Sequence, residues 1–369
     1  MRNNQKVKMR ESGFEMVRII AMAMIVANHL INHGIMKVSG PDPYALWSGM
    51  SSINRIISAV TSCGGRIGVA VFFMLTGYFM AEREKISVPS VFNFLGKVHF
   101  FAAVMLCIFL LLRTSTGFGA DFDLPSAVKK SLFIPATLWW FAFAYLVLMF
   151  LAPSINIFVR SMKRKGVVLI LLLYIWYFFY RDGSSLYSYY DFIKAVFFYM
   201  TGAFIKETEG ENSGFSGSVG GLLFHVLLFL CAFFLCGYLM YDVIQDSTNG
   251  TSIIGNILFW TPNQILNNIL IPLTGLLLLL VGKIRFSSRL VNHIASCTFG
   301  VYLFHEYSYT RTFLWHNILK ADVVQFKSSL FPLYILLDVA VIFLAGIILE
   351  TIRVQLEKLV RKVGHQGRF

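Results

Sequence analysis

The amino-acid sequence predicts an all-α, polytopic integral membrane protein with about ten transmembrane helices and both ends of the chain in the cytoplasm. Three observations predict this fold class: the composition, the recurrence of long apolar segments, and the distribution of Lys and Arg between them. Hydrophobic residues make up 57% of the 369 residues and charged residues only 14%, and the mean hydropathy is +0.67. A soluble domain usually contains about 25% charged residues, so we expect lipid to cover much of the surface.

Apolar segments close to the length that crosses a bilayer, about 17 to 25 residues, recur along the whole chain. The fifth and sixth of them are short, and residues 253–260 could form a re-entrant or interfacial piece, so the count of ten could differ by one. The predicted spans are 15–36, 64–82, 95–113, 131–153, 166–180, 190–206, 220–241, 263–282, 291–310 and 330–353.

The positions of Lys and Arg predict the orientation, because cytoplasmic loops of membrane proteins retain positive charge. With the N-terminus inside, most of the 32 Lys and Arg residues fall on inner segments. This bias accounts for the formal net charge of +13 without a nucleic-acid partner. We therefore expect a cytoplasmic basic N-terminus at 1–14, a transmembrane domain at 15–353 and a cytoplasmic basic tail at 354–369, in a multi-pass protein of the plasma membrane.

The first predicted helix carries ionisable residues, each of which costs several kcal/mol inside a membrane unless it is paired or hydrated. Arg18 and His29 are eleven residues apart, which places them on one helix face and roughly 16 Å apart along the axis. Glu15 lies one turn before Arg18, and His33 lies one turn after His29. The spacing suits a cation that holds phosphates near the cytoplasmic side and an imidazole, deeper in the membrane, that accepts a proton from a hydroxyl.

This polar stripe also has a purely structural explanation. Arg18 could extend to the lipid headgroups with Glu15 as its partner, while His29 forms a hydrogen bond to a neighbouring helix, because polar residues also hold helix bundles together. The stripe alone leaves the two explanations equally open. The five cysteines are scattered and form no Cys-x-x-Cys pair, so we expect neither a disulfide framework nor a zinc site.

Five segments resemble motifs of the acyltransferase-3 family of membrane O-acyltransferases, in the order in which that family carries them. Glu15, Arg18 and His29 are similar to the family's acidic residue, Arg and, ten residues further on, His. The second helix of the family has a Phe-Phe-x-x-Ser-Gly motif, where this chain has Phe72, Phe73, Thr76 and Gly77. The other matching segments are Trp140-Phe141 with Tyr145-Leu146 and Pro153-Ser154-Ile155-Asn156, then Ser296 with Tyr302-Leu303-Phe304-His305, and last Glu350 with Arg353.

Two features favour the branch of the family that modifies surface polysaccharides. Arg66 opens the second predicted helix, as an Arg often does in that branch, and the fourth helix follows that branch's pattern. Many other relatives carry Trp-Ser-Leu and a Glu in the fourth helix, whereas residues 139–144 contain no acid. No segment after the last predicted helix corresponds to the extracytoplasmic domain of some relatives, so we expect the membrane domain, an oligomer of it or a separate partner enzyme to complete the reaction.

The resemblance implies that an acyl-CoA, most often acetyl-CoA, is the cytoplasmic donor and that a hydroxyl of a cell-surface or lipid-linked glycan is the acceptor. It implies no metal. Arg18 would contact the CoA phosphates or the pantetheine arm, with Glu15 orienting it and Lys97 as a further donor-side cation. His29 would act as a general base or carry the acyl group covalently. The expected outer or acceptor-side residues are Arg66, His305, His33 and Trp140, and the expected structural motif residues are Phe72, Phe73, Thr76, Gly77 and Tyr302.

Three other functions compete with this interpretation. A transporter or flippase for a lipid-linked saccharide or small solute would use the polar stripe as a permeation path, and internal inverted repeats would favour it. A polysaccharide polymerase or ligase would be expected to carry a large outer loop, and the longest predicted here, about 37–63, is modest. A structural scaffold would not need Arg18 and His29 on one buried face.

Overall fold

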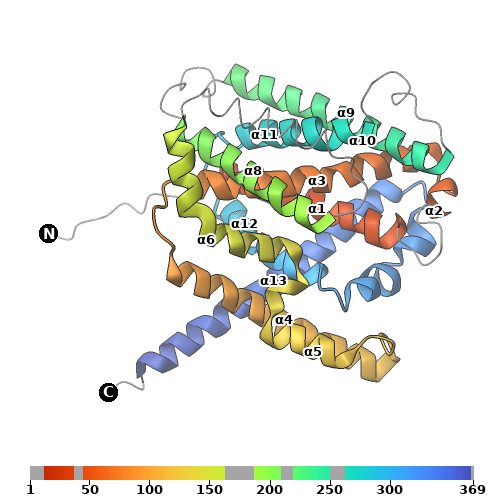
Figure 1. Cartoon of the computed structure of the whole chain (residues 1–369). Helices are drawn as coiled ribbons and strands as arrows, with labels where there is room; N and C mark the ends of the chain where they lie inside the picture. The colour runs from red at the N-terminus through yellow and green to blue at the C-terminus, as the bar shows by residue number, and fades with distance from the viewer. Residues whose placement is uncertain (1–11, 37–44, 163–186, 209–218, 250–261, 367–369) are drawn as a thin grey trace.

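The computed structural model describes residues 12–36, 45–162, 187–208, 219–249 and 262–366, and every regular element in these ranges is a helix (Figure 1). The helices, in chain order, are α1 (Gly13–Ile31), η1 (Asn32–Met36), α2 (Ala45–Ser48), α3 (Ser52–Met80), α4 (Val88–Thr116), α5 (Leu124–Phe133), η2 (Pro135–Leu138), α6 (Trp140–Ser161), α8 (Tyr187–Glu207), α9 (Val219–Asn249), α10 (Pro262–Ile265), η3 (Leu266–Leu270), α11 (Ile271–Val281), α12 (Arg289–His305), η4 (Phe313–Ile318), η5 (Ala321–Gln325) and α13 (Phe331–Gln366).

Seven of the described helices are long and apolar enough to cross a membrane, which confirms an all-α, polytopic membrane protein. Helices α8 and α12 lie at the predicted spans 190–206 and 291–310. The predicted span 166–180 and the possible re-entrant piece 253–260 lie outside the described residues. The seven long helical runs are Gly13–Met36, Ser52–Met80, Val88–Thr116, Trp140–Ser161, Gly220–Gln245, Asn263–Val281 and Phe331–Lys362.

Two boundaries differ from the sequence prediction for identifiable reasons. Helix α3 begins at Ser52 rather than at residue 64, because the Ser51 hydroxyl caps it by accepting a hydrogen bond from the Asn54 N–H at 3.2 Å. The predicted span 131–153 is divided instead of continuous. Helix α5 ends at Phe133, two residues before Pro135, and α6 begins only at Trp140, because the residue before a proline disfavours helical geometry.

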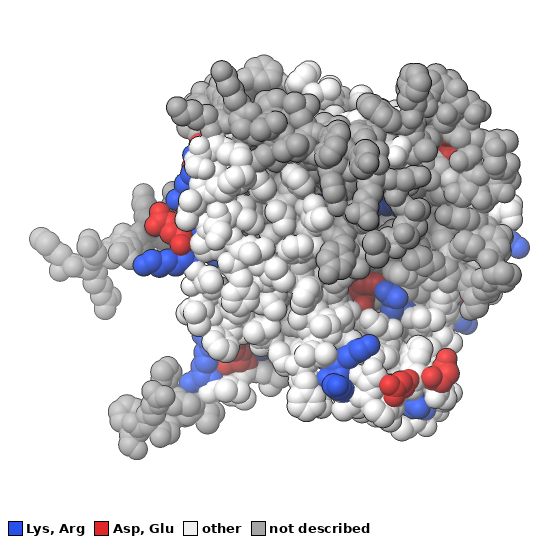
Figure 2. All heavy atoms as spheres, viewed as in Figure 1, with Lys and Arg blue, Asp and Glu red and all other residues white. Residues whose placement is uncertain are grey.

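The segments that the charge pattern assigns to opposite sides of the membrane lie at opposite ends of the helix bundle. At one end, the Ser12 hydroxyl donates to Asn292 Oδ1 at 2.8 Å, and Arg160 pairs with Glu84 at 3.3 Å and with Glu207 at 3.1 Å. We call this the inner end, because its segments are those predicted to be cytoplasmic. Figure 2 shows charged residues toward the margins of one face and a broad band without charge between them, as a lipid-facing belt requires.

The opposite, outer end is held together by hydrogen bonds between distant loops. Asn54 Nδ2 donates to the backbone carbonyl oxygens of Phe326 and Ser328 at 3.0 and 2.9 Å. The hydroxyls of Ser131 and Tyr307 lie 2.7 Å apart, which joins α5 to the segment after α12. Helix α1 runs from the inner end toward this end and continues there as the π-helical turn η1.

Small residues let the central helices pack closely around α3. Gly77 on α3 and Gly202 on α8 form one crossing: a Cβ at Gly77 would lie 1.9 Å from the Tyr199 carbonyl oxygen, and one at Gly202 would lie 1.8 Å from the Met74 carbonyl oxygen. Gly68 serves the α1–α3 contact, since a Cβ there would lie 2.5 Å from the Ala21 carbonyl oxygen. Small residues permit such close backbone approach in membrane helices.

Replacing Gly77 by Ala should destabilise the protein, because backbone rather than a flexible side chain blocks the added methyl group. Overpacking of this kind costs about 1–3 kcal/mol, measurable as a lower midpoint of thermal unfolding in detergent. Gly96 on α4 is the matched control, since a Cβ there would meet nothing within 4 Å, and Gly96→Ala should be neutral or stabilising. Equal midpoints for the two variants would contradict the close α3–α8 crossing.

Candidate active site

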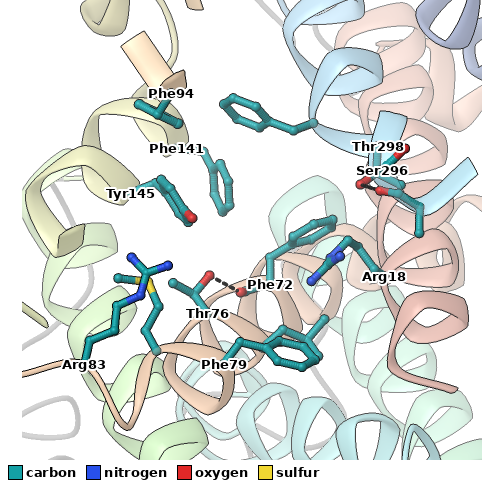
Figure 3. A pocket seen from close by; sticks show the side chains of 14 residues that line it. Arg18, Phe72, Thr76, Phe79, Arg83, Phe94, Phe141, Tyr145, Ser296 and Thr298 are labelled. Atoms are coloured by element: carbon teal, nitrogen blue, oxygen red, sulfur yellow. Dashed lines mark hydrogen bonds between the residues drawn. The ribbon is translucent and has the colours of Figure 1, made fainter. Parts of the chain in front are cut away.

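A cavity of about 310 Å³ opens between α1, α3, α4, α6 and α12, toward the inner end of the bundle (Figure 3). Aromatic rings form most of its walls, and two arginines and several hydroxyls supply its polar groups. Its lining residues are Arg18, Phe72, Leu75, Thr76, Phe79, Met80, Arg83, Phe94, Phe141, Tyr145, Ala295, Ser296, Thr298 and Phe299.

Arg18 lines the cavity and is bonded there to the carboxylate of Glu15. Arg18 Nη1 donates to Glu15 Oε2 at 2.6 Å, and Glu15 is buried with 1% of its surface exposed. The guanidinium also lies 5.8 Å from the ring centroid of Phe79. Since the i,i+3 spacing on α1 places Glu15 and Arg18 on one face, the carboxylate holds the guanidinium at the cavity wall.

Arg83, in the loop that follows α3, is a second cation of the same cavity and was not among the site residues expected from the sequence. Figure 3 shows Arg18 and Arg83 approaching the cavity from different sides. Asn156 on α6 fixes the backbone beside Arg83, because its Nδ2 donates to the carbonyl oxygens of Met80 at 2.7 Å and of Arg83 at 2.9 Å. The Tyr199 hydroxyl donates to Asn156 Oδ1 at 3.0 Å and completes this link.

At the outer end of α1, His29 and His305 form a hydrogen-bonded pair that fixes the tautomer of both rings. His305 Nδ1 lies 2.7 Å from the Val301 carbonyl oxygen, which can only accept, so Nδ1 carries the proton. In a neutral ring, His305 Nε2 is then the acceptor, and His29 Nδ1, 2.9 Å away, donates to it. His29 Nε2 is left with a lone pair, and within the described part of the chain it forms no hydrogen bond.

A buried carboxylate joins this cluster from the residue after α12. Glu306 is 7% exposed, and its Oε2 lies 3.6 Å from His29 Nδ1 while its Oε1 lies 3.2 Å from His33 Nε2. Arg311 Nη1 donates to Glu306 Oε1 at 2.6 Å. The structure therefore brings together three histidines that the sequence analysis selected, around one carboxylate that it had not selected as a site residue.

Aromatic side chains occupy the region between the inner cavity and the histidine cluster. The Tyr302 ring lies 5.5 Å from Phe141 and 6.2 Å from Phe299, both of which line the cavity. On its other side the same ring lies 6.1 Å from His305. Tyr302 is 4% exposed, so it forms a shared wall between the two polar sites.

Four other residues selected from the sequence lie apart from the histidine cluster. Lys97 Nζ forms an ion pair with Glu350 at 2.9 Å and lies 5.4 Å from the ring of Phe299, which places it behind the cavity wall and not among the lining residues. Arg66 is exposed at the middle of α3, where its Nη1 donates to Asn267 Oδ1 at 2.6 Å. Trp140 and Phe73 pack on each other and on Phe141.

The second-helix motif divides between two tasks. Phe72 and Thr76 line the cavity, and the Thr76 hydroxyl donates to the Phe72 carbonyl oxygen at 2.8 Å (Figure 3). Phe73 and Gly77 point away from it, into the contacts of α3 with α6 and α8. The motif thus places one face of α3 at the cavity and packs the other face against α6 and α8.

Comparison with known proteins bears directly on this site. A family model described as an acyltransferase domain, acyltransferase-3, matches residues 11–350. The chain belongs to the acyltransferase-3 family. No curated protein and no solved structure matches the chain. The matched range contains the inner cavity and the histidine cluster, so both belong to the acyltransferase domain.

Sequence signals for the additional residues of this acyltransferase domain existed but were weak. Arg83 directly follows the second predicted span, where any cytoplasmic loop carries positive charge. Glu306 adjoins His305, and Arg311 lies five residues further on, in a segment that periodicity does not resolve. Only the folded chain shows that Arg83 enters the inner cavity and that Glu306, bonded to Arg311, meets His29, which lies 276 residues before His305.

His29, His33 and Glu306 each offer one ligand atom within 4.8 Å of the others, a spacing that could also hold a metal ion. Two of the candidate ligand atoms already have partners, since Glu306 Oε1 accepts from Arg311 and His29 Nδ1 donates to His305. We therefore expect EDTA treatment of the purified membranes to leave acyl transfer unchanged. Loss of activity on chelation, and its recovery on adding Zn²⁺, would contradict this expectation.

Proposed function

We propose that this acyltransferase moves an acyl group, with acetyl as the expected one, from cytoplasmic acyl-CoA to a hydroxyl of a cell-surface or lipid-linked glycan at the plasma membrane. The observation that carries the proposal is the fixed tautomer of His29. Its Nδ1 donates to His305, so that Nε2 keeps its lone pair at a buried site within the membrane domain. A general base needs such a nitrogen, held in one orientation by the other.

The inner cavity supports a phosphate-bearing donor. Arg18 and Arg83 give it two guanidinium groups, which bind phosphate with a planar set of donors. The aromatic rings around them would cover the apolar pantetheine arm. Because Arg18 and His29 lie on one face of α1, roughly 16 Å apart, a donor anchored at Arg18 would need an extended arm to bring its thioester to His29, and pantetheine is such an arm.

The reaction follows from these positions. His29 Nε2 accepts the proton of the acceptor hydroxyl while the hydroxyl oxygen attacks the thioester carbonyl carbon. The carbon–sulfur bond then breaks, and the CoA thiolate takes the proton from His29 to leave as a thiol. The same lone pair could instead attack the thioester carbon, so that the carbon–sulfur bond breaks, CoA leaves as the thiolate and Nε2 holds the acyl group. The acceptor hydroxyl oxygen then takes the acyl group from Nε2, and the hydroxyl proton passes to the CoA thiolate. Both routes need the Nδ1 proton that His305 fixes.

Removing the base or the donor anchor should abolish the transfer of radiolabel from acetyl-CoA to glycan in membranes that contain matched amounts of protein. His29→Ala should lower the rate by about 10²-fold or more, and Arg18→Ala by roughly tenfold or more through lost hydrogen bonds to phosphate. The controls are His225→Ala, whose ring bonds only its own helix, and Arg361→Ala on the exposed end of α13. Full activity of His29→Ala would overturn the mechanism.

Arg83→Gln should raise the KM for acetyl-CoA about tenfold, because a charge-assisted hydrogen bond to phosphate is lost, while changing kcat less. Lys85→Gln is the matched control, since Lys85 is an exposed cation of the same loop outside the cavity lining. S-acetylpantetheine, which lacks phosphates, should react equally well with wild type and Arg83→Gln. An unchanged KM for acetyl-CoA would remove Arg83 from the donor site.

A further inference from the structure

The Glu306 carboxylate accepts from Arg311 on both oxygens and lies close to two imidazoles of another part of the fold. Oε2 lies 3.6 Å from His29 Nδ1, and Oε1 lies 3.2 Å from His33 Nε2, both on the first helical run Gly13–Met36. Oε1 also accepts from Arg311 Nη1 at 2.6 Å. One carboxylate therefore lies beside two imidazoles that are one helical turn apart, and a guanidinium is bonded to it as well.

The burial of the Glu306 charge does not by itself explain why two histidines lie beside it. A buried carboxylate needs a compensating charge, and Arg311 already supplies one. The two histidines are not required for that balance, because each is charged only when it binds a proton. Their approach to Glu306 matters when His29 gains positive charge, which happens when it accepts the proton of the acceptor hydroxyl.

We propose that Glu306 is a positioning residue for the acyl transfer: its negative charge, 3.6 Å from His29 Nδ1, stabilises the imidazolium that forms there, with Arg311 and His33 fixing the carboxylate through Oε1. This inference rests on the proposed function, since it assumes that His29 is the base. Groups facing His29 in the cluster are His33, His305, Glu306 and Arg311. Of these, only Glu306 is an anion, so it alone can offset a positive charge on the ring.

His305 and Glu306 then have separate tasks, although they are adjacent in sequence. His305 Nδ1 donates to the Val301 carbonyl oxygen of its own helix, and His305 Nε2 accepts a hydrogen bond from His29 Nδ1. These two bonds set the tautomer of the His29 ring. Glu306 sets the electrostatic environment of the charged form. A carboxylate that orients and stabilises a catalytic histidine is a recurrent device in acyl-transfer sites, and here its orientation depends on Arg311.

The alternative is a structural ion pair that only attaches Arg311 to the end of α12. The two roles predict different outcomes for the double variant Glu306→Gln/Arg311→Gln, which removes both charges together. If the pair is structural, the double variant should regain the stability lost by Glu306→Gln and regain activity with it. If Glu306 is a positioning residue, stability should return while activity stays low.

The experiment measures acetyl transfer from acetyl-CoA in full-length protein for wild type, Glu306→Gln, Glu306→Asp and the double variant. We expect Glu306→Gln to lower kcat about 10²-fold with the KM for acetyl-CoA unchanged, because the inner cavity does not include Glu306. Glu306→Asp keeps the charge and should recover part of the rate. Glu357→Gln, which removes a carboxylate from the Arg353–Glu357 pair on α13, is the matched control and should be fully active.

Failure of this inference is distinguishable from failure of the proposed function. If wild type and His29→Ala differ in transfer but Glu306→Gln matches wild type, the positioning role is wrong and the acyltransferase mechanism stands. Recovery of activity in the double variant would also overturn the positioning role. If wild type transfers no acyl group from any acyl-CoA, the proposed function fails first, and the inference that depends on it fails with it.

Discussion

The structure depends on one constraint: each ionisable group that is carried into the apolar bundle has to meet a partner there, because lipid and packed side chains offer none of the hydration that water would. The chain satisfies this constraint by pairing charges between helices that are distant in sequence. Lys97 on α4 pairs with Glu350 on α13, and Glu306 after α12 meets His29 on α1. Such pairs help to fix the relative positions of these helices, so the pairing of buried charges also determines the geometry of the site.

The two polar sites are separated by aromatic packing. The inner cavity is lined by two arginines, whereas the outer cluster has three imidazoles and one carboxylate that pairs with Arg311. Tyr302 touches both sides, with Phe141 toward the cavity and His305 toward the cluster. The two sites therefore differ in their ionisable groups and share the Tyr302 ring as a common wall.

The sequence predicted the fold class and the first-helix stripe well, because both depend on local patterns. Apolar length and the Lys and Arg distribution predict spans directly, and the eleven-residue spacing of Arg18 and His29 places them on one face whatever surrounds α1. The partners of these residues could not be predicted. Glu306 meets His29 only through the way α12 packs against α1, and Arg83 enters the cavity because Asn156, on another helix, holds the carbonyl oxygen beside it. The apolar composition of residues 131–153 predicts one continuous helix, and it gives no sign that Pro135 divides this span.

Asn156 has a consequence for how the inner cavity can change its width. By bonding the end of α3 and accepting from Tyr199, it fastens α3, α6 and α8 into one body. On the facing side, Gly346 lets α13 contact the backbone of Val301 on α12. Glu350, also on α13, forms an ion pair with Lys97 on α4, so α4, α12 and α13 are joined as well. The cavity lies on the seam between these two fastened bodies. If the two bodies part, each wall would move as a unit, so the entrance would widen while the chemical groups within each wall keep their spacing.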